Sequence, residues 1–386
     1  MSYTLAVQSL VARPWEPVRL AQPVPVDSLP TPALLLDEDA FERNVERMAE
    51  HLRDKGKGFR PHAKTHKCPI IAARQLAAGA VGVCAAKVSE AVVLINAGVG
   101  PVLITSAVAT SGKAGVVAQL ARQGQLSIVV DGDLSLRVLE EAVDEDVELG
   151  VLVDVDVDMG RTGTRDVADI LRLAERVERH PNLRFEGIQH YAGHLMHVDG
   201  YQARRERSLG LWEKVAAIVA ELGERGVSPT IVTGAGTGTF NIDCDVAELT
   251  DLQVGSYIFM DREYRLIGGE QGPLFDDFEV SLTVATTAIS QPLAQTITVD
   301  GGYKAFASDT VNPEPLDLPG AKFRFGGDEH GILILPEGNQ EPLLGKQQRF
   351  ITPHCDPTVN LYDHYWVHRD GHAHSIWPIA ARGCSW

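Results

Sequence analysis

Cysteine is scarce in this sequence. The cysteines are odd in number, widely spaced and free of any Cys-x-x-Cys pair: Cys68, Cys84, Cys244, Cys355 and Cys384. This pattern argues against a zinc knuckle and is typical of a protein from a reducing compartment. Residues 1–30 contain five prolines and lack the apolar core of a signal peptide. We therefore expect a cytoplasmic protein.

Long apolar runs and an excess of basic charge are also missing. Because no stretch of about eighteen apolar residues occurs, the sequence predicts no membrane span. The formal net charge is -17, whereas binding to nucleic acid or to an anionic membrane requires clustered lysine and arginine. Neither partner is expected. The length of 386 residues favours two domains, or one barrel with an accessory domain.

Short apolar runs alternate with helix-like segments over about two hundred residues. The eight runs are residues 59–62, 81–84, 102–105, 126–131, 149–156, 185–191, 230–233 and 249–256. Apolar residues at helical spacing lie between them, in residues 87–97, 115–122, 134–143, 167–178 and 201–226. This alternation predicts a (β/α)8 TIM barrel. A doubly wound open sheet is the alternative, because one sequence does not reveal strand order.

The segments on either side of the barrel have different patterns. Residues 31–37 read as a strand, followed by a helix with Phe41, Val45, Met48 and Leu52 on one face. From about residue 275 the helical period disappears, and short runs are broken by Gly and Pro. We expect an N-terminal extension (residues 1–30), a barrel (31–270) and a C-terminal all-β domain (271–386).

A lysine among histidines follows the first apolar run, in Arg-Pro-His-Ala-Lys-Thr-His-Lys at residues 60–67. A lysine whose pKa is lowered by cations or burial becomes a nucleophile that can form an imine with pyridoxal phosphate (PLP). Most lysines are simply exposed. Lys64, however, ends the first predicted strand, on the rim where barrel enzymes place their chemistry. Lys64 is therefore the candidate cofactor lysine.

Glycine-rich turns follow the seventh run and end the eighth, where barrels commonly hold a phosphate. Glycine lets backbone N–H groups approach a phosphate, and hydroxyl groups add donors. For either loop alone, a tight turn without a ligand is an equal alternative. The candidate cofactor-binding residues of the two turns are Gly236, Thr237, Gly238, Thr239, Gly255, Ser256 and Tyr257.

Two further turns carry residues suited to a pyridoxal ring. Arg161 lies in a glycine-flanked turn after the fifth run, where a guanidinium can donate to a phenolic oxygen. After the sixth run, Tyr191 can pack on the ring, and His194 or His197 can act as acid or base. A solvated arginine and a structural histidine are the ordinary alternatives.

Together the motifs resemble a known family. They are Pro-His-Ala-Lys-Thr-His-Lys (61–67), Met-Gly-Arg-Thr-Gly (159–163), Gly-Ala-Gly-Thr-Gly (234–238), and residues 253–261, 328–331 and 354–358. In this order, from about Thr31 to Gly383, they resemble the metal-activated D-threonine aldolase group of the alanine racemase-like, fold type III PLP enzymes. The resemblance implies that Lys64 forms the Schiff base and that Arg161 lies near the phenolic oxygen. It also places Thr237, Gly238, Ser256 and Tyr257 around the phosphate.

The same resemblance implies that His354 and Asp356 bind a divalent metal. On a strand, residues i and i+2 share a face, so these side chains would converge while Cys355 points away. Imidazole with carboxylate suits Mn²⁺, our first choice, or Mg²⁺, Co²⁺ or Zn²⁺. Two ligands leave open positions, as in a catalytic site. A His-x-Asp strand end without metal is the alternative reading.

The expected reaction is the cleavage of a D-β-hydroxy-α-amino acid to glycine and an aldehyde, with His197 as the base. One alternative is a 3-hydroxy-D-aspartate aldolase, which would use a cation such as Lys304 or Arg324 for the β-carboxylate. A dehydratase is less favoured, because related D-serine dehydratases look like His-x-Cys where this chain has Asp356. Non-catalytic PLP-binding proteins lack a second β domain and a metal pair.

The resemblance also implies a homodimer. In that arrangement the β domain of one chain covers the barrel of the other, which excludes water from the site. We expect Lys64 and the His354/Asp356 pair of each active site to come from different chains.

Overall fold

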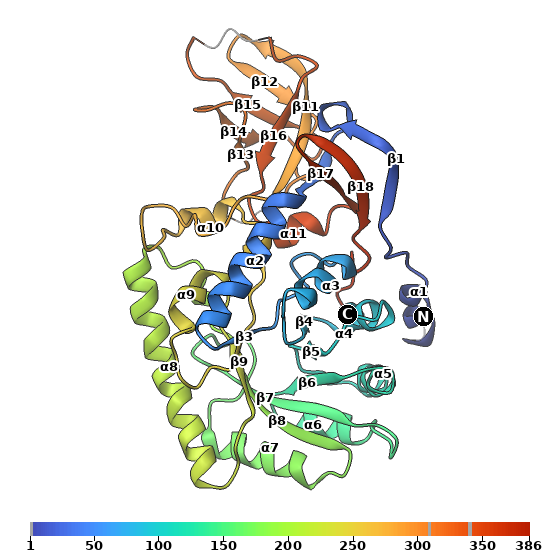
Figure 1. The fold of residues 1–386 in the computed structure, drawn as a ribbon, viewed down its shortest axis with the longest axis vertical. Helices are drawn as coiled ribbons and strands as arrows, with labels where there is room; N and C mark the ends of the chain where they lie inside the picture. Colours follow the sequence, from blue (N-terminus) through green and yellow to red (C-terminus); the bar gives the residue numbers. More distant parts are fainter. Residues whose placement is uncertain (1–2, 308–309, 339–341) are drawn as a thin grey trace.

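A barrel and a β-sheet unit stacked on it make up the computed structural model, which describes residues 3–307, 310–338 and 342–386 (Figure 1). Within these residues the barrel contains eight parallel strands: β3 (Gly58–Phe59), β4 (Val83–Ala85), β5 (Val102–Ile104), β6 (Leu126–Val130), β7 (Leu149–Val155), β8 (Leu183–His190), β9 (Ile231–Gly234) and β10 (Asp251–Leu252). Each predicted apolar run overlaps one of these strands or ends beside it.

The barrel is closed. Its strands follow the order β3-β10-β9-β8-β7-β6-β5-β4. Between the two ends of this order, Val81 N donates to Phe59 O and Ala63 N donates to Cys84 O, beside a parallel bridge from His62 to Cys84. The (β/α)8 prediction is therefore confirmed, and the open-sheet alternative is wrong.

Amphipathic helices surround the strands: α3 (Pro69–Ala77), α4 (Val88–Asn96), α5 (Ser111–Ala121), α6 (Asp133–Glu140), α7 (Val167–Arg179), α8 (Tyr201–Glu224), α9 (Phe240–Asp243) and α10 (Arg262–Leu266). Helix α7 shows why they form. It buries one face that includes Ile170 and Leu173, and the Asp166 side chain caps it by accepting from Ala168 N at 2.8 Å. Strand β7, covered on both faces, is buried along its whole length.

Both ends of the chain build the second sheet. Its strands are β1 (Val18–Pro25), β2 (Ala33–Asp37), β11 (Leu282–Leu293), β12 (Thr296–Val299), β13 (Glu314–Pro315), β14 (Lys322–Phe325), β15 (Gly331–Ile334), β16 (Gln347–Ile351), β17 (His364–Arg369) and β18 (His372–Pro378). Strand β2 pairs with β11 and β17, and β1 pairs with β18. The N-terminal strand expected to precede the barrel thus belongs to this sheet. The boundaries at residues 30 and 270 stay predictions.

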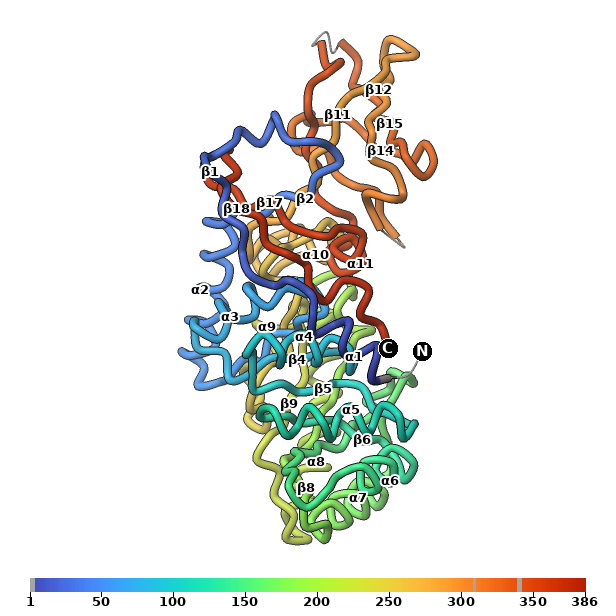
Figure 2. The backbone as a smooth tube through the Cα atoms, turned by 90° about the vertical axis from the view of Figure 1, so that its right-hand side faces the viewer, coloured from blue at the N-terminus to red at the C-terminus, as the bar shows by residue number. Residues whose placement is uncertain are grey.

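Two helices join the sheet to the barrel. Helix α2 (Glu38–Asp54) runs between the two units in Figure 1 and buries the predicted face of Phe41, Val45, Met48 and Leu52. Helix α11 (Cys355–Val359) follows β16, so the C-terminal unit is not purely β. Both termini lie side by side near α1 (Tyr3–Val11) in both views (Figure 2).

Disulfide bonds and membrane-spanning helices can both be assessed in the described residues. The five cysteines are all free and buried, so none of them forms a disulfide. The longest described helices are too polar or too short for a bilayer, and none meets the requirements of a membrane span.

Candidate functional site

The turns after β3, β8, β9 and β10 meet at one end of the barrel. A side chain on Gly255 would place its Cβ 2.6 Å from Thr65 Oγ1, and a Cβ on Gly236 would lie 2.5 Å from Met196 Sδ. Only glycine allows these backbones to approach so closely. This packing brings the Lys64 turn, the histidine turn and both glycine-rich turns together, as the barrel prediction required.

Lys64 lies in a cavity of about 590 Å³ whose lining includes His62, Arg161, Gln189, Tyr191 and Gln253. Lys64 Nζ is 5.6 Å from the centre of the Tyr191 ring, and the Arg161 guanidinium is 5.3 Å from the same centre. Three of the predicted cofactor residues therefore surround one space. Tyr191 is placed to cover a flat ring between the lysine and the arginine.

The pKa of Lys64 is shifted in the direction opposite to the one expected from the sequence. Burial favours the neutral amine, but nearby Tyr191 and Asp356 outweigh it and raise the pKa of Lys64. The expected lowering of this pKa is therefore wrong for the chain by itself. Tyr191 makes the larger contribution, and the next comes from Asp356, a carboxylate that we expected on another chain.

That carboxylate is Asp356, whose Oδ2 lies 3.9 Å from Lys64 Nζ within one chain. The expectation that the lysine and the His354/Asp356 pair come from different chains is wrong at this point. Helix α11 follows β16, which pairs with β11 next to β2, and this topology carries the pair back over its own barrel. The charges of His354 and Lys64 overcome the effect of burial and lower the pKa of Asp356, which favours the carboxylate.

A mixing experiment tests this arrangement. If Lys64→Ala chains are mixed with Asp356→Ala chains, we expect no recovery of activity, because each site of a mixed dimer lacks one of the two residues. Differently tagged chains show whether subunits have exchanged, and aldehyde release measures activity. Partial recovery after proven exchange would show that the two residues act in trans.

The segment from His354 to Asp356 is a helix start and not a strand end. His354 is the N-terminal cap of α11, so the argument from strand alternation is wrong. Cys355 does not point away either, because its Sγ, the His354 ring and the Asp261 carboxylate all lie within 4.8 Å of one another. Burial and the charges of Asp261 and Asp356 raise the pKa of Cys355 well above its usual value. A neutral thiol is a poor metal ligand.

Asp261, a residue to which the sequence assigned no role, contacts His354. Its Oδ2 is 2.9 Å from His354 Nδ1. Burial lowers the pKa of His354, but the Asp261 hydrogen bond and the charges of Asp356, Asp261 and Glu263 together raise it to about 9. The only signal in the sequence was its place at the end of the 253–261 motif. These carboxylates favour positive charge here, as a divalent cation would require.

His197 lies beside this group, and His194 does not share its contacts. The His197 ring is 6.3 Å from the His354 ring and 5.1 Å from the Tyr264 ring. Burial lowers the pKa of His197, so its neutral, proton-accepting form predominates near neutral pH. His194 is exposed in a short turn, residues Gly193–Leu195. His190 packs 4.0 Å from Trp212 in the core and is structural.

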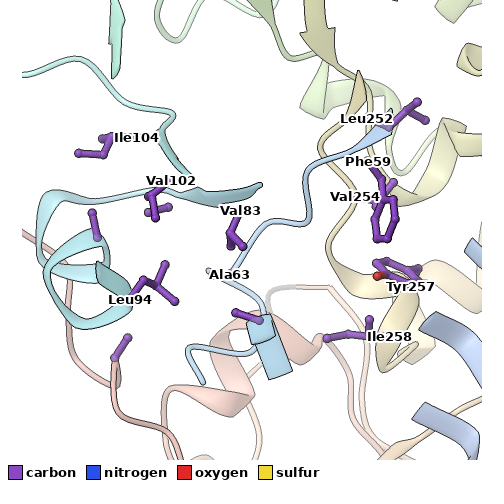
Figure 3. Packing of buried hydrophobic residues seen from close by; sticks show 14 of the residues in the cluster. Phe59, Ala63, Val83, Leu94, Val102, Ile104, Leu252, Val254, Tyr257 and Ile258 are labelled. Atoms are coloured by element: carbon purple, nitrogen blue, oxygen red, sulfur yellow. The ribbon is translucent and has the colours of Figure 1, made fainter. Parts of the chain in front are cut away.

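The two glycine-rich turns form one unit. Thr237 Oγ1 accepts hydrogen bonds from Gly255 N at 3.4 Å and from Tyr257 N at 3.1 Å. The Tyr257 side chain is buried among apolar residues such as Phe59 and Val254 (Figure 3), and its hydroxyl accepts from Gln75. Because the Tyr257 N–H already donates to Thr237 and its side chain is buried, the predicted role of Tyr257 as a phosphate donor is not supported by these contacts.

Other hydroxyl groups of this region differ in availability. Thr239 Oγ1 donates to Asp243 at 2.5 Å and is fully buried, so this predicted donor is already used. Thr65 Oγ1 is also buried, beside Gly255. A hydrogen bond from the Thr65 side chain helps to lower the pKa of Asp356, so this hydroxyl lies near both the glycine turn and that carboxylate.

The two cations considered for a β-carboxylate lie elsewhere. Lys304 pairs with Glu329, and both side chains are exposed on the β-sheet unit. Arg324 is exposed on β14. Neither contacts the His354 group.

Comparison with known proteins shows the family of this chain. Residues 36–263 match the family described as alanine racemase, N-terminal domain, and residues 281–368 match a serine dehydratase domain. D-threonine aldolase of Arthrobacter sp is 39% identical over 94% of this chain and 95% of its own. The chain belongs to the D-threonine aldolase family. Members of this family are carbon–carbon lyases, and the alanine racemase-like fold is confirmed.

Two more relatives are similar to this chain along almost its whole length. The crystal structure of D-threonine aldolase from Filomicrobium marinum has a TM-score of 0.91 and 37% identity, covering 96% of this chain and 100% of that one. The 3-hydroxy-D-aspartate aldolase of Paracoccus denitrificans (strain Pd 1222) is 33% identical over 92% of both chains. The name of this second relative indicates a substrate that carries a carboxylate, and not a methyl group, on its β-carbon.

Proposed function

We propose that this protein is a PLP- and divalent-metal-dependent aldolase that cleaves D-β-hydroxy-α-amino acids of the D-threonine type to glycine and an aldehyde. One observation carries the proposal. Lys64 Nζ lies 3.9 Å from Asp356 in the cavity that Arg161 and Tyr191 line or flank. A cofactor lysine and a metal-binding carboxylate can thus reach one small substrate.

The residues around Lys64 fit PLP. Lys64 would hold the cofactor, Tyr191 would pack on its ring, and Arg161 would donate to its phenolic oxygen. The phosphate would lie at the joined turns, near Gly236, Gly238, Gly255 and the hydroxyl groups of Thr237 and Ser256. The close approach of Thr65 to Gly255 and of Met196 to Gly236, which only glycine permits, supports this placement.

The residues around His354 fit a divalent cation. Asp261 engages Nδ1 of His354, so Nε2 is the nitrogen that would bind a cation in exchange for the proton that the raised pKa of His354 favours, and Asp356 carries a carboxylate with a lowered pKa. Asp261 already accepts from Cys355 N and Tyr264 N as well, so it is less available as a ligand. Nitrogen and oxygen donors without thiolate suit Mn²⁺, our first choice, and also Mg²⁺, Co²⁺ or Zn²⁺.

Lys64, His197 and Tyr191 would each have a separate role in the cleavage reaction. Bound PLP supplies an electron sink for the carbanion at Cα, and a bound metal supplies a Lewis acid for the β-hydroxyl. Lys64 would be the residue that holds PLP in the absence of substrate. His197, in its neutral form, accepts the proton of the β-hydroxyl, which drives cleavage of the Cα–Cβ bond. Tyr191 and the surrounding turns keep the reacting carbon covered.

The charges near His354 favour a neutral β-substituent. Asp261, Glu263 and Asp356 all influence His197, and neither Lys304 nor Arg324 reaches them. A β-carboxylate would be repelled here, although a metal would reduce this repulsion. We therefore place D-threonine-like substrates ahead of 3-hydroxy-D-aspartate.

Product analysis tests the function directly. With PLP and Mn²⁺, D-threonine should give glycine and acetaldehyde in equal amounts and no ammonia, and 3-hydroxy-D-aspartate should react more slowly. L-threonine is the control and should not react. Ammonia with an oxo acid would identify a dehydratase, and faster release of glyoxylate would identify a hydroxyaspartate aldolase.

We also propose a cytoplasmic homodimer. His197 remains open to solvent in the single chain, and a second chain over the barrel mouth would exclude water from the base and the metal. Such a partner would cover a site that already contains Lys64, His354 and Asp356.

A further inference from the structure

Asp261 links the end of the barrel to the metal pair. Its side chain is fully buried, and its carboxylate accepts three hydrogen bonds: from Tyr264 N at 2.9 Å, Cys355 N at 2.8 Å and His354 Nδ1 at 2.9 Å. We propose that Asp261 is a positioning residue for the metal centre, which selects the His354 tautomer with a free Nε2. This inference rests on the proposed function, because it assumes that His354 binds the metal.

The backbone around Asp261 makes the contact rigid. Arg262 N donates to Thr352 O, and Glu263 N donates to Pro353 O. Residues 261–263 therefore run alongside residues 352–355, and the carboxylate joins the start of α10 to the start of α11. Because both helix starts are tied to one side chain, the His354 ring has little freedom to turn.

The tautomer follows from the acceptor. A carboxylate oxygen at 2.9 Å requires a proton on Nδ1, so the lone pair of the neutral ring lies on Nε2. A carboxylate that holds the second nitrogen of a histidine ligand orients the ring and raises its basicity. Glu263 Oε2 is 3.7 Å from the same nitrogen, which is too far for a hydrogen bond. Of these two carboxylates, only that of Asp261 accepts a hydrogen bond from His354 Nδ1.

Two roles of Asp261 can be separated by substitution. Asp261→Ser keeps an oxygen that can cap α10 but is too short to reach His354. Asp166→Ser changes another capping aspartate, at the start of α7 and outside the site, and serves as the matched control. The probe is Mn²⁺ alone, titrated into the full-length, PLP-loaded protein and followed by calorimetry or electron paramagnetic resonance.

We expect Asp261→Ser to weaken Mn²⁺ binding by about 10- to 100-fold, the range typical of lost partners of metal ligands. The visible absorbance of bound PLP should stay close to that of Asp166→Ser, whereas the thermal midpoint should fall further, because Asp261 is buried and makes three hydrogen bonds. Equal Mn²⁺ affinity in Asp261→Ser and the wild type would overturn the inference alone. A wild-type chain that binds no Mn²⁺ would overturn the proposed metal centre as well.

A second pair of variants separates position from charge and does not depend on the serine variant folding. Asp261→Asn and Glu263→Gln each remove one negative charge near His354, but only the first changes the group that holds Nδ1. We expect the larger loss of Mn²⁺ affinity in Asp261→Asn. Equal losses would show that charge, and not positioning, explains the role of Asp261.

Discussion

Replacing Lys64 with alanine is expected to abolish covalent PLP binding and to lower aldolase activity by at least about 1,000-fold, the scale of a lost catalytic group. Lys64 is the lysine that faces Tyr191 and Asp356 across the cavity. Absorbance at the visible edge and aldehyde release measure the two effects. The fold should survive, because the Lys64 side chain is 37% exposed.

Neighbouring lysines provide the controls for this result. Lys67 is three residues away but forms a buried ion pair with Glu90 at 2.5 Å, so it is not free to attack a carbonyl. Lys87 also lines the cavity. After borohydride reduction, peptide mapping should find the cofactor on Lys64. A label on Lys67 or Lys87 would refute the assignment.

Replacing either His354 or Asp356 with alanine is expected to remove the divalent metal and to cut activity by about 100- to 10,000-fold, because a site with two protein ligands has no redundancy. Metal content after dialysis and aldehyde release measure this prediction. EDTA should likewise stop turnover while PLP stays bound. Full activity in a metal-free sample would contradict the assignment.

Asp356→Ala and His354→Ala should also differ in their effect on the pKa of Lys64. Asp356→Ala removes the negative charge 3.9 Å from Lys64 Nζ, so the pKa of Lys64 should fall, whereas His354→Ala should not lower it. Cys355→Ala is the matched control between them. Its thiol is neutral and buried, so we expect reduced stability with the metal retained.

The position of Asp356 changes how this site is understood. Tyr191 and, after it, the Asp356 carboxylate raise the pKa of Lys64, so the neutral amine needed for attack is less populated in the chain without ligands. A bound divalent cation would draw the Asp356 charge to itself and release the lysine from it. Cofactor loading should therefore be faster in the presence of Mn²⁺ than in EDTA.

Local sequence determined the barrel and most of the cofactor site. Buried parallel strands are short apolar runs, and the eight runs could be recognised because each is followed by a turn or helix pattern. Once the barrel was predicted, the position of Lys64, Arg161, Tyr191 and the glycine turns at strand ends followed, since parallel strands share one catalytic rim. The structure brings these residues together.

Long-range contacts decided the rest. His354 begins a helix because Cys355 N finds its acceptor in Asp261, a residue 94 positions away, and no local pattern encodes that bond. Asp261 was missed because its partners are so distant in sequence, and another long-range contact places Asp356 beside Lys64 of its own chain. Side-chain periodicity depends on neighbours in sequence, whereas the pKa of a lysine and the tautomer of a histidine depend on neighbours in space, so only the tertiary structure could reveal them.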